Sequence, residues 1–134
     1  MRRVTLRATF EEELRRHGIV WCIGGCRFRS SHRRGFATPG TVHLDAAIGT
    51  RRTLYRALHE VAHVVLGHTG PRRRPRWQLE AEAEAWTQRR LSELGVEIPD
   101  ASVAAGEAYI ARMHRWGAAI SRANTVSGRR RAPR

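Results

Sequence analysis

The chain has 134 residues, of which 41% are apolar, so it can form one domain with a modest core, and wholesale disorder is excluded. Its formal net charge is +13, from 25 basic and 12 acidic residues, and every one of those basic residues is arginine. No apolar run approaches the roughly 20 residues that a membrane span requires, and the acidic run 11–13 interrupts any signal peptide. We therefore expect a cytoplasmic protein.

The first part of the chain predicts one helix and a small sheet. A capping box that begins at Thr9 predicts a helix that ends at Gly18. The apolar run 19–23 predicts a strand, and two further strands, at 36–37 and 41–45, flank a Pro-Gly turn. We expect these three strands to form a small antiparallel sheet.

The second part predicts three helices, the first of which runs from Arg51 and ends at Gly67. Its apolar residues recur at helical spacing and form one stripe: Leu54, Leu58, Val61 and Val65. Further helices are expected at 77–94 and 101–121, and the Ser-, Gly- and Arg-rich segment 122–134 is expected to be a disordered basic tail. The order of elements predicts a single α+β domain over residues 1–121.

The first of these helices contains the motif His59-Glu60-Val61-Ala62-His63, which is H-E-x-x-H. Residues i and i+4 of a helix lie on one face, so both imidazoles can reach the same metal ion. Glu60 follows at about 100° around the helix axis, where it can act as a general base on a water molecule. The two histidines lie about 140° to 180° from Leu54, away from the predicted core stripe, which argues against a purely structural role.

A catalytic zinc site needs a third protein ligand, and the next helix offers Glu80, Glu82 and Glu84. Glu82 lies on the same side of this helix as three apolar residues, Leu79, Ala83 and Trp86. A carboxylate turned toward a core is costly unless it is paired or bound to a metal, so we expect His59, His63 and Glu82 to bind Zn²⁺. The alternatives are that Glu82 pairs with an arginine and that Glu80 is the ligand.

These residues together resemble the ImmA/IrrE family of metallopeptidases, which show H-E-x-x-H followed by E-x-E-A-[N/D]-x-F-A. The similarity covers about half of the chain, from Phe36 to Pro99, and Glu82 matches the family's third zinc ligand. Glu84 stands where Asn or Asp is usual. The resemblance implies a gluzincin-like fold and a zinc endopeptidase with Glu60 as its catalytic base. It also implies a protein substrate, often a transcriptional repressor of a phage or mobile element.

The arginine-rich segments Arg72–Arg74 and Arg129–Arg131 favour a second interpretation. Such clusters attract nucleic acid without sequence preference. The alternative function is therefore a basic nucleic-acid-binding or regulatory protein that is stabilised by a metal and turns over no substrate. No recognised nucleic-acid-binding motif accompanies the arginines.

Two further sets of residues are candidates for smaller roles. His17, Cys22, Cys26 and His32 have a spacing that can hold a second zinc ion, although Cys22 in an apolar run is more typical of a buried structural thiol. The group that stabilises the oxyanion is left open among four residues: Tyr55, His68, Tyr109 and His114. His68 is expected to cap the end of its helix or to face solvent.

Overall fold

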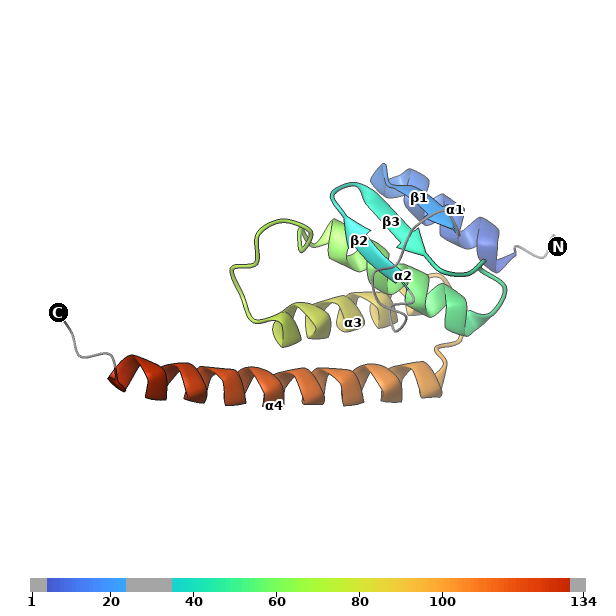
Figure 1. Ribbon diagram of the computed structural model, residues 1–134. Helices are drawn as coiled ribbons and strands as arrows, with labels where there is room; N and C mark the ends of the chain where they lie inside the picture. The colour runs from blue at the N-terminus through green and yellow to red at the C-terminus, as the bar shows by residue number, and fades with distance from the viewer. Residues whose placement is uncertain (1–4, 24–34, 131–134) are drawn as a thin grey trace.

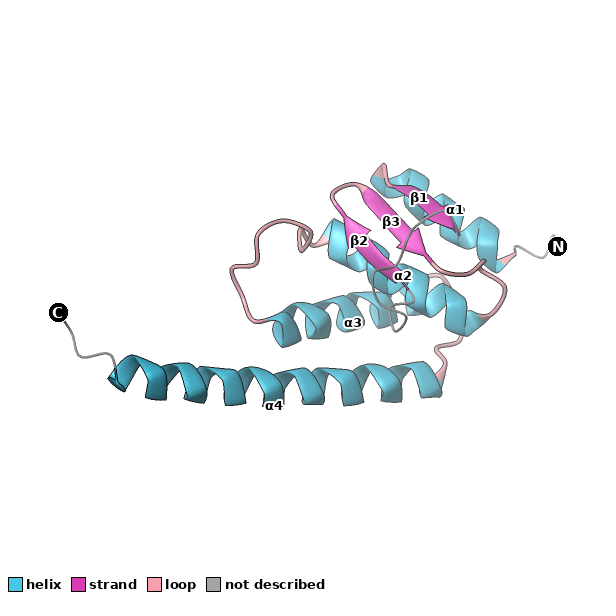
Figure 2. Cartoon of the chain, viewed as in Figure 1, coloured by secondary structure: helices cyan, strands magenta, loops and turns pink. Residues whose placement is uncertain are grey.

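The computed structural model describes residues 5–23 and 35–130, and its α+β class confirms the expectation from the sequence (Figure 1). Within these residues the elements are α1 (Leu6–His17), β1 (Val20–Ile23), β2 (Gly35–Thr38), β3 (Thr41–Leu44), α2 (Arg51–Val65), α3 (Arg76–Glu93) and α4 (Asp100–Arg130). In Figure 2 the sheet, α2, α3 and α4 follow one another from top to bottom. Helix α2 therefore lies in the middle, where it contacts the sheet as well as the other three helices.

Helix α1 begins one turn earlier than predicted. The hydroxyl of Thr5, not Thr9, caps it by accepting a hydrogen bond from Ala8 N at 3.1 Å. The earlier start adds Leu6 to the side of the helix that carries the fully buried Phe10. This additional apolar contact explains why the helix begins after Thr5 and not after Thr9. The predicted end is confirmed, because the helix stops at a glycine in the left-handed region.

The sheet is mixed, so the expectation of an antiparallel sheet is wrong for one strand. Strands β2 and β3 form the predicted antiparallel hairpin, but β1 pairs with β3 in parallel, in the order β1-β3-β2. The backbone N–H of Val20 donates to Gly40 O at 3.0 Å, which aligns the start of β1 with the start of β3. Strand β3 takes the centre because its Val42 and Leu44 are both buried.

One face of the sheet packs on α2, and the other carries Cys22, Phe36 and His43. The Sγ atom of Cys22 lies 3.2 Å from Nδ1 of His43, and the Phe36 ring stacks on the same imidazole. Cys22 thus occupies a strand, as expected.

Of the other candidate ligands of a second zinc ion, His17 contacts Glu13 and Trp86. Cys26 and His32 lie outside the described residues, so that second site stays a prediction.

Helix α2 follows its prediction closely. Thr50 caps its start, and Leu54, Leu58 and Val61 are fully buried. The fourth residue of the predicted stripe, Val65, is 37% exposed, so the buried stripe ends one turn before the helix does.

Helix α4 continues to Arg130, so its predicted end at Ser121 is wrong. The segment expected to be a disordered tail is helical as far as it is described, and residues 131–134 lie outside the described part. The chain has no proline between Pro99 and Pro133, so nothing in it forces an earlier stop. No helix in the described part of the chain is long and apolar enough to cross a membrane.

Candidate metal centre

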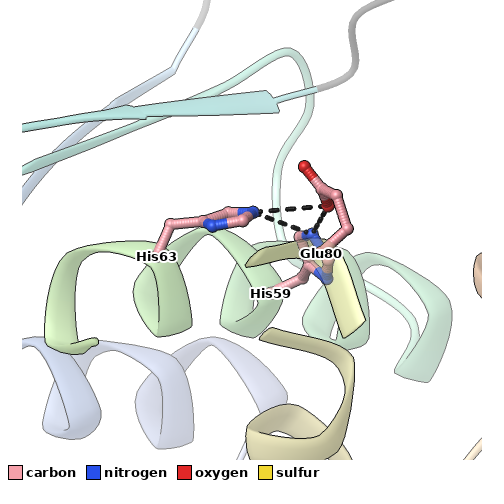
Figure 3. Close-up of side chains that lie close together, drawn as sticks. All are labelled: His59, His63 and Glu80. Carbon is pink, nitrogen blue, oxygen red and sulfur yellow. Dashed lines mark hydrogen bonds and ion pairs between the residues drawn. The ribbon is translucent and has the colours of Figure 1, made fainter. Parts of the chain in front are cut away.

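Three polar side chains from α2 and α3 converge beside the centre of the molecule (Figure 3). Nε2 of His59 lies 3.1 Å from Nε2 of His63, one turn further along α2. The Oε2 atom of Glu80, on α3, lies 2.7 Å from the first of these nitrogens and 3.4 Å from the second. The i, i+4 spacing of the motif thus brings the two imidazoles together, as the sequence predicts.

This donor set fits a divalent metal ion. A tetrahedral site with bonds of about 2.0 to 2.1 Å has ligand atoms about 3.3 Å apart, close to the three separations among His59, His63 and Glu80. Two imidazole nitrogens that face each other at 3.1 Å also repel unless a proton or a metal ion lies between them. The three side chains are only 12 to 14% exposed, so they can hold a metal while one position stays open to the cleft.

The structure brings Glu80, one of the alternatives that the sequence left open, and not Glu82, beside the histidines. Five residues of α3 are buried: Leu79, Ala83, Trp86, Thr87 and Leu91. At 100° per residue, Glu80 lies about 20° from Thr87 and from Leu91, within the buried face, whereas Glu82 lies about 40° beyond Trp86 at its other margin. Helix α2 presents its histidines on the Glu80 side. Glu82 instead pairs with Arg74 and with Nε2 of His68, which was the other alternative that the sequence left open.

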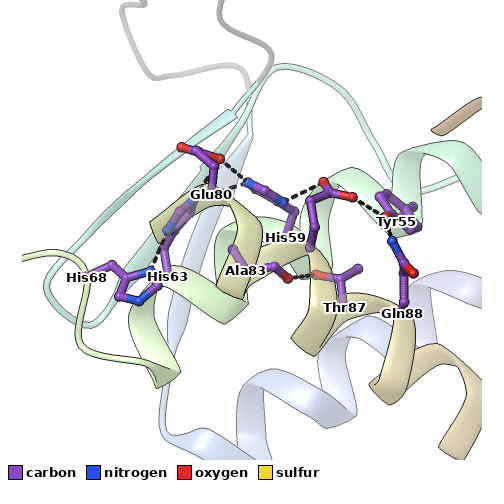
Figure 4. Close-up of polar contacts among 9 residues, drawn as sticks. Tyr55, His59, His63, His68, Glu80, Ala83, Thr87 and Gln88 are labelled. Atoms are coloured by element: carbon purple, nitrogen blue, oxygen red, sulfur yellow. Dashed lines mark hydrogen bonds and ion pairs between the residues drawn. The ribbon is translucent and has the colours of Figure 1, made fainter. Parts of the chain in front are cut away.

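Each histidine is oriented by a second partner through its Nδ1 atom (Figure 4). Nδ1 of His59 lies 2.9 Å from Oε1 of Glu84, and Nδ1 of His63 lies 3.0 Å from Nδ1 of His68. Nε2 of His68 in turn lies 3.0 Å from Oε2 of Glu82. With protons on both Nδ1 atoms, His63 donates a hydrogen bond to His68, and His59 faces the Glu84 carboxylate in a close charge contact that lacks hydrogen-bond geometry. This protonation leaves the Nε2 lone pairs of both rings free for a metal ion.

Glu84 is itself held from two sides. The hydroxyl of Tyr55 donates a hydrogen bond to it and accepts one from Gln88 Nε2 at 3.2 Å. Helix α4 reaches Glu84 at Gly106, where a Cβ atom would lie 2.6 Å from the carboxylate carbon. Only a glycine lets α4 approach this closely, so the position of Glu84 is tied to that of α4.

The electrostatics of the site favour a cation. Burial would lower the pKa of His59, but contacts with the carboxylates of Glu80 and Glu84 outweigh it and raise the pKa to about 10. Burial alone would raise the pKa of Glu80, yet His59 and His63 hold that pKa well below its usual range. Without a metal, the site therefore contains a protonated His59 beside an ionised Glu80, and a proton takes the place that a metal ion would fill.

Glu60 lies next to the metal group and lines a cleft with a volume of about 770 Å³. The cleft is bounded by β2, α2, α3, α4 and the loop between α2 and α3, and the three converging side chains also line it. The Cγ atom of Glu60 packs against Gly35, where a Cβ atom would lie only 3.2 Å away. The backbone of β2 thus limits where the Glu60 carboxylate can go.

The structure also separates the four candidates for an oxyanion-stabilising group. Tyr55 and His68 are engaged in the contacts described above, and His114 packs against the ring of Trp77 at 4.7 Å. Tyr109 lines the cleft and is 37% exposed. Of the four, Tyr109 is the one with a hydroxyl that no described residue engages.

The fold and the site define an α+β protein with a candidate centre of two histidines and one glutamate for a metal ion. No protein-family model matches the chain, and comparisons with characterised proteins and with solved structures give no match. The sequence analysis left Glu80 open as an alternative ligand but did not predict that Glu84 and His68 contact the two imidazoles. Only the spacing of Glu80 and Glu84, one helical turn apart, was a signal that two carboxylates share a face.

Proposed function

We propose that this protein is a zinc-dependent endopeptidase of the ImmA/IrrE type that cleaves a protein partner such as a transcriptional repressor. The observation that carries this proposal is the convergence of His59, His63 and Glu80 in the wall of a cleft, with Glu60 beside them. Two imidazoles and one carboxylate, with a further position open, are the donor set that catalytic zinc sites use. The motif H-E-x-x-H supplies the two imidazole ligands and the base, and α3 supplies the carboxylate ligand.

A zinc ion held by His59, His63 and Glu80 would supply a Lewis acid that polarises the peptide carbonyl. Glu60 takes a proton from the attacking water molecule and delivers it to the leaving amine, so that one residue serves as base and then as acid. The phenol of Tyr109, which lines the cleft, is our candidate for donating a hydrogen bond to the carbonyl oxygen as charge develops there. Glu84 and His68 hold the imidazole rings in place during these steps.

The edge of the sheet offers a place for the substrate backbone. Strand β2 lies at the edge, and Gly35, Phe36 and Ala37 line the cleft. No strand in the described part of the chain pairs with the outer edge of β2. An extended peptide can add to such an edge through main-chain hydrogen bonds, which places its carbonyl groups along the cleft.

The first test measures zinc per chain in untagged protein purified without a chelator. We expect about one zinc per chain and little or none in His63→Ala and Glu80→Ala. Glu82→Ala should retain zinc, because it removes a contact to His68 and no ligand. Loss of zinc in Glu82→Ala but not in Glu80→Ala would contradict this ligand set.

The second test measures hydrolysis of a quenched-fluorescent peptide library by the zinc-loaded protein. We expect Glu60→Gln to keep zinc and the fold but to lose hydrolysis, because it removes only the base. If the wild type binds zinc but cleaves no more than Glu60→Gln, the peptidase proposal fails. The second interpretation, a metal-stabilised basic binding protein, would then account for the chain.

A further inference from the structure

Two groups of the arginines whose side chains the structure describes differ in their surroundings. One group forms ion pairs with carboxylates and consists of Arg7, Arg15, Arg51, Arg74, Arg89 and Arg90. None of these six lines the cleft. The arginines that line the cleft without an ion pair to any described residue are Arg52, Arg72, Arg76 and Arg112. The other described arginines without such an ion pair, Arg16, Arg73 and Arg115, lie outside the lining, so four of these seven positive charges border the candidate active site.

The carboxylates of the cleft do not cancel this charge. They are Glu60, Glu80 and Glu84, and the last two contact His59 at its opposite ring nitrogens. A divalent metal ion at the site would add two further positive charges. Because the cleft walls exclude part of the solvent, the field of these charges is screened less there than on an open surface.

The arginines approach the cleft from different directions. Arg52 lies in the first turn of α2, Arg72 in the loop that follows α2, Arg76 at the start of α3 and Arg112 on α4. An extended peptide that lies along β2 would pass between these elements. Guanidinium groups bind carboxylates through paired hydrogen bonds, so successive acidic side chains of such a peptide would each find a partner.

We infer that the cleft selects a segment of protein that is rich in aspartate and glutamate. This inference rests on the proposed function and specifies its substrate class. A nucleic acid duplex also attracts arginine, but it is a rod about 20 Å wide that cannot enter a cleft of this volume. It would meet arginines outside the lining, such as Arg73 and Arg115, at least as well as those inside it.

The test uses the zinc-loaded full chain with Glu60→Gln, which prevents cleavage during the measurement. The probe is a fluorescein-labelled eight-residue peptide in which Glu and Asp alternate with Ala, and its neutral counterpart carries Gln and Asn instead. Binding is measured by fluorescence anisotropy at 0.15 M salt, where the screening length is about 8 Å. We expect the acidic peptide to bind at least tenfold more tightly than the neutral one.

Two triple variants separate the cleft from the overall charge of the chain. The cleft variant carries R52Q, R72Q and R112Q, and the control variant carries R16Q, R73Q and R115Q, which are unpaired arginines outside the lining. Both lower the formal charge from +13 by three. We expect the cleft variant to lose about tenfold or more in affinity for the acidic peptide, and the control variant to lose less than about threefold. Thermal unfolding of both variants at the temperature of the parent protein excludes a folding defect.

Three outcomes would overturn the inference. The first is an equal loss of affinity in the two triple variants, and the second is equal binding of the acidic and neutral peptides. The third is that a 20-base-pair duplex displaces the acidic peptide and that this displacement depends on the arginines of the cleft. Each leaves the zinc and hydrolysis tests unaffected. Cleavage of neutral peptides as fast as acidic ones would refute the substrate class while the peptidase stands. Selective binding without any cleavage by the wild type would refute the peptidase while the acidic ligand stands.

Discussion

The ion pair between Glu13 of α1 and Arg90 of α3 is nearly buried, and its removal tests how the two helices are held together. The Glu13 side chain is 2% exposed and that of Arg90 is 15% exposed. The guanidinium donates two hydrogen bonds to the carboxylate, one of them from Nε to Oε2 at 2.8 Å. These bonds keep the pKa of Arg90 above its already high usual value.

The two single substitutions should differ in their effect, because the partners that remain differ. Arg90→Met leaves the buried Glu13 with only His17, whose Nε2 lies 3.7 Å away, so we expect a loss of about 3 to 5 kcal/mol in the free energy of unfolding. Glu13→Gln leaves Arg90 with Glu93 at 2.8 Å and with partial solvent contact, so we expect a loss of about 1 to 3 kcal/mol.

The double variant makes the reasoning falsifiable. Adding Glu13→Gln to Arg90→Met removes the stranded charge, so the double variant should be more stable than Arg90→Met alone. The measurement is urea unfolding of the chelator-treated protein, followed by tryptophan fluorescence. A matched control is Glu12→Gln on the exposed pair with Arg15, where we expect about 0.5 kcal/mol or less. Additive losses in the double variant would refute the argument.

Three further predictions concern the metal centre. Gly106→Ala forces Glu84 or α4 to move, so we expect zinc affinity to fall by about 10- to 100-fold in a competition titration; unchanged affinity would contradict the contact. Gly35→Val crowds Glu60 and should lower the rate of hydrolysis by tenfold or more with zinc content unchanged, and a full rate would show that β2 does not position the base. In the metal-free protein, the raised pKa of His59 stabilises the fold fully below pH 6.5, and this contribution is lost as the pH rises toward about 10. The free energy of unfolding should therefore fall by up to about 1.4 kcal/mol per pH unit over that range, and the zinc-loaded protein should lack this slope in thermal denaturation.

The helices and the H-E-x-x-H site could be predicted because local spacing determines them. The positions of Leu54, Leu58 and Val61 set the buried face of α2, and the same periodicity places His59 and His63 together on another face. The hairpin of β2 and β3 was also predictable, since a Pro-Gly turn with a positive φ at Gly40 joins the strands.

Apart from the start of α1 and the end of α4, the errors concern relations between elements that are distant in the sequence. Periodicity places Glu80 and Glu82 at opposite margins of the apolar face of α3, but it does not show which margin faces α2. His68 was expected at a helix end or in solvent, yet its side chain is 2% exposed because the loop after α2 folds back toward His63. The parallel direction of β1 likewise depends on a pairing with β3 that sequence order does not reveal.

The ligands of the candidate centre come from two helices, which makes a bound metal ion a cross-link within the chain. His59 and Glu80 are 21 residues apart, and a bond between them would close a loop of that length. Closing such a loop restricts the unfolded chain by about 3 kcal/mol, an effect comparable to that of a disulfide. Loss of the metal would remove this restriction and lower the free energy of unfolding of the whole domain, because α3 also packs on α2 and is tied to α1 through Arg90 and Glu13. Metal supply would thus set the stability of the fold as well as the chemistry of the cleft.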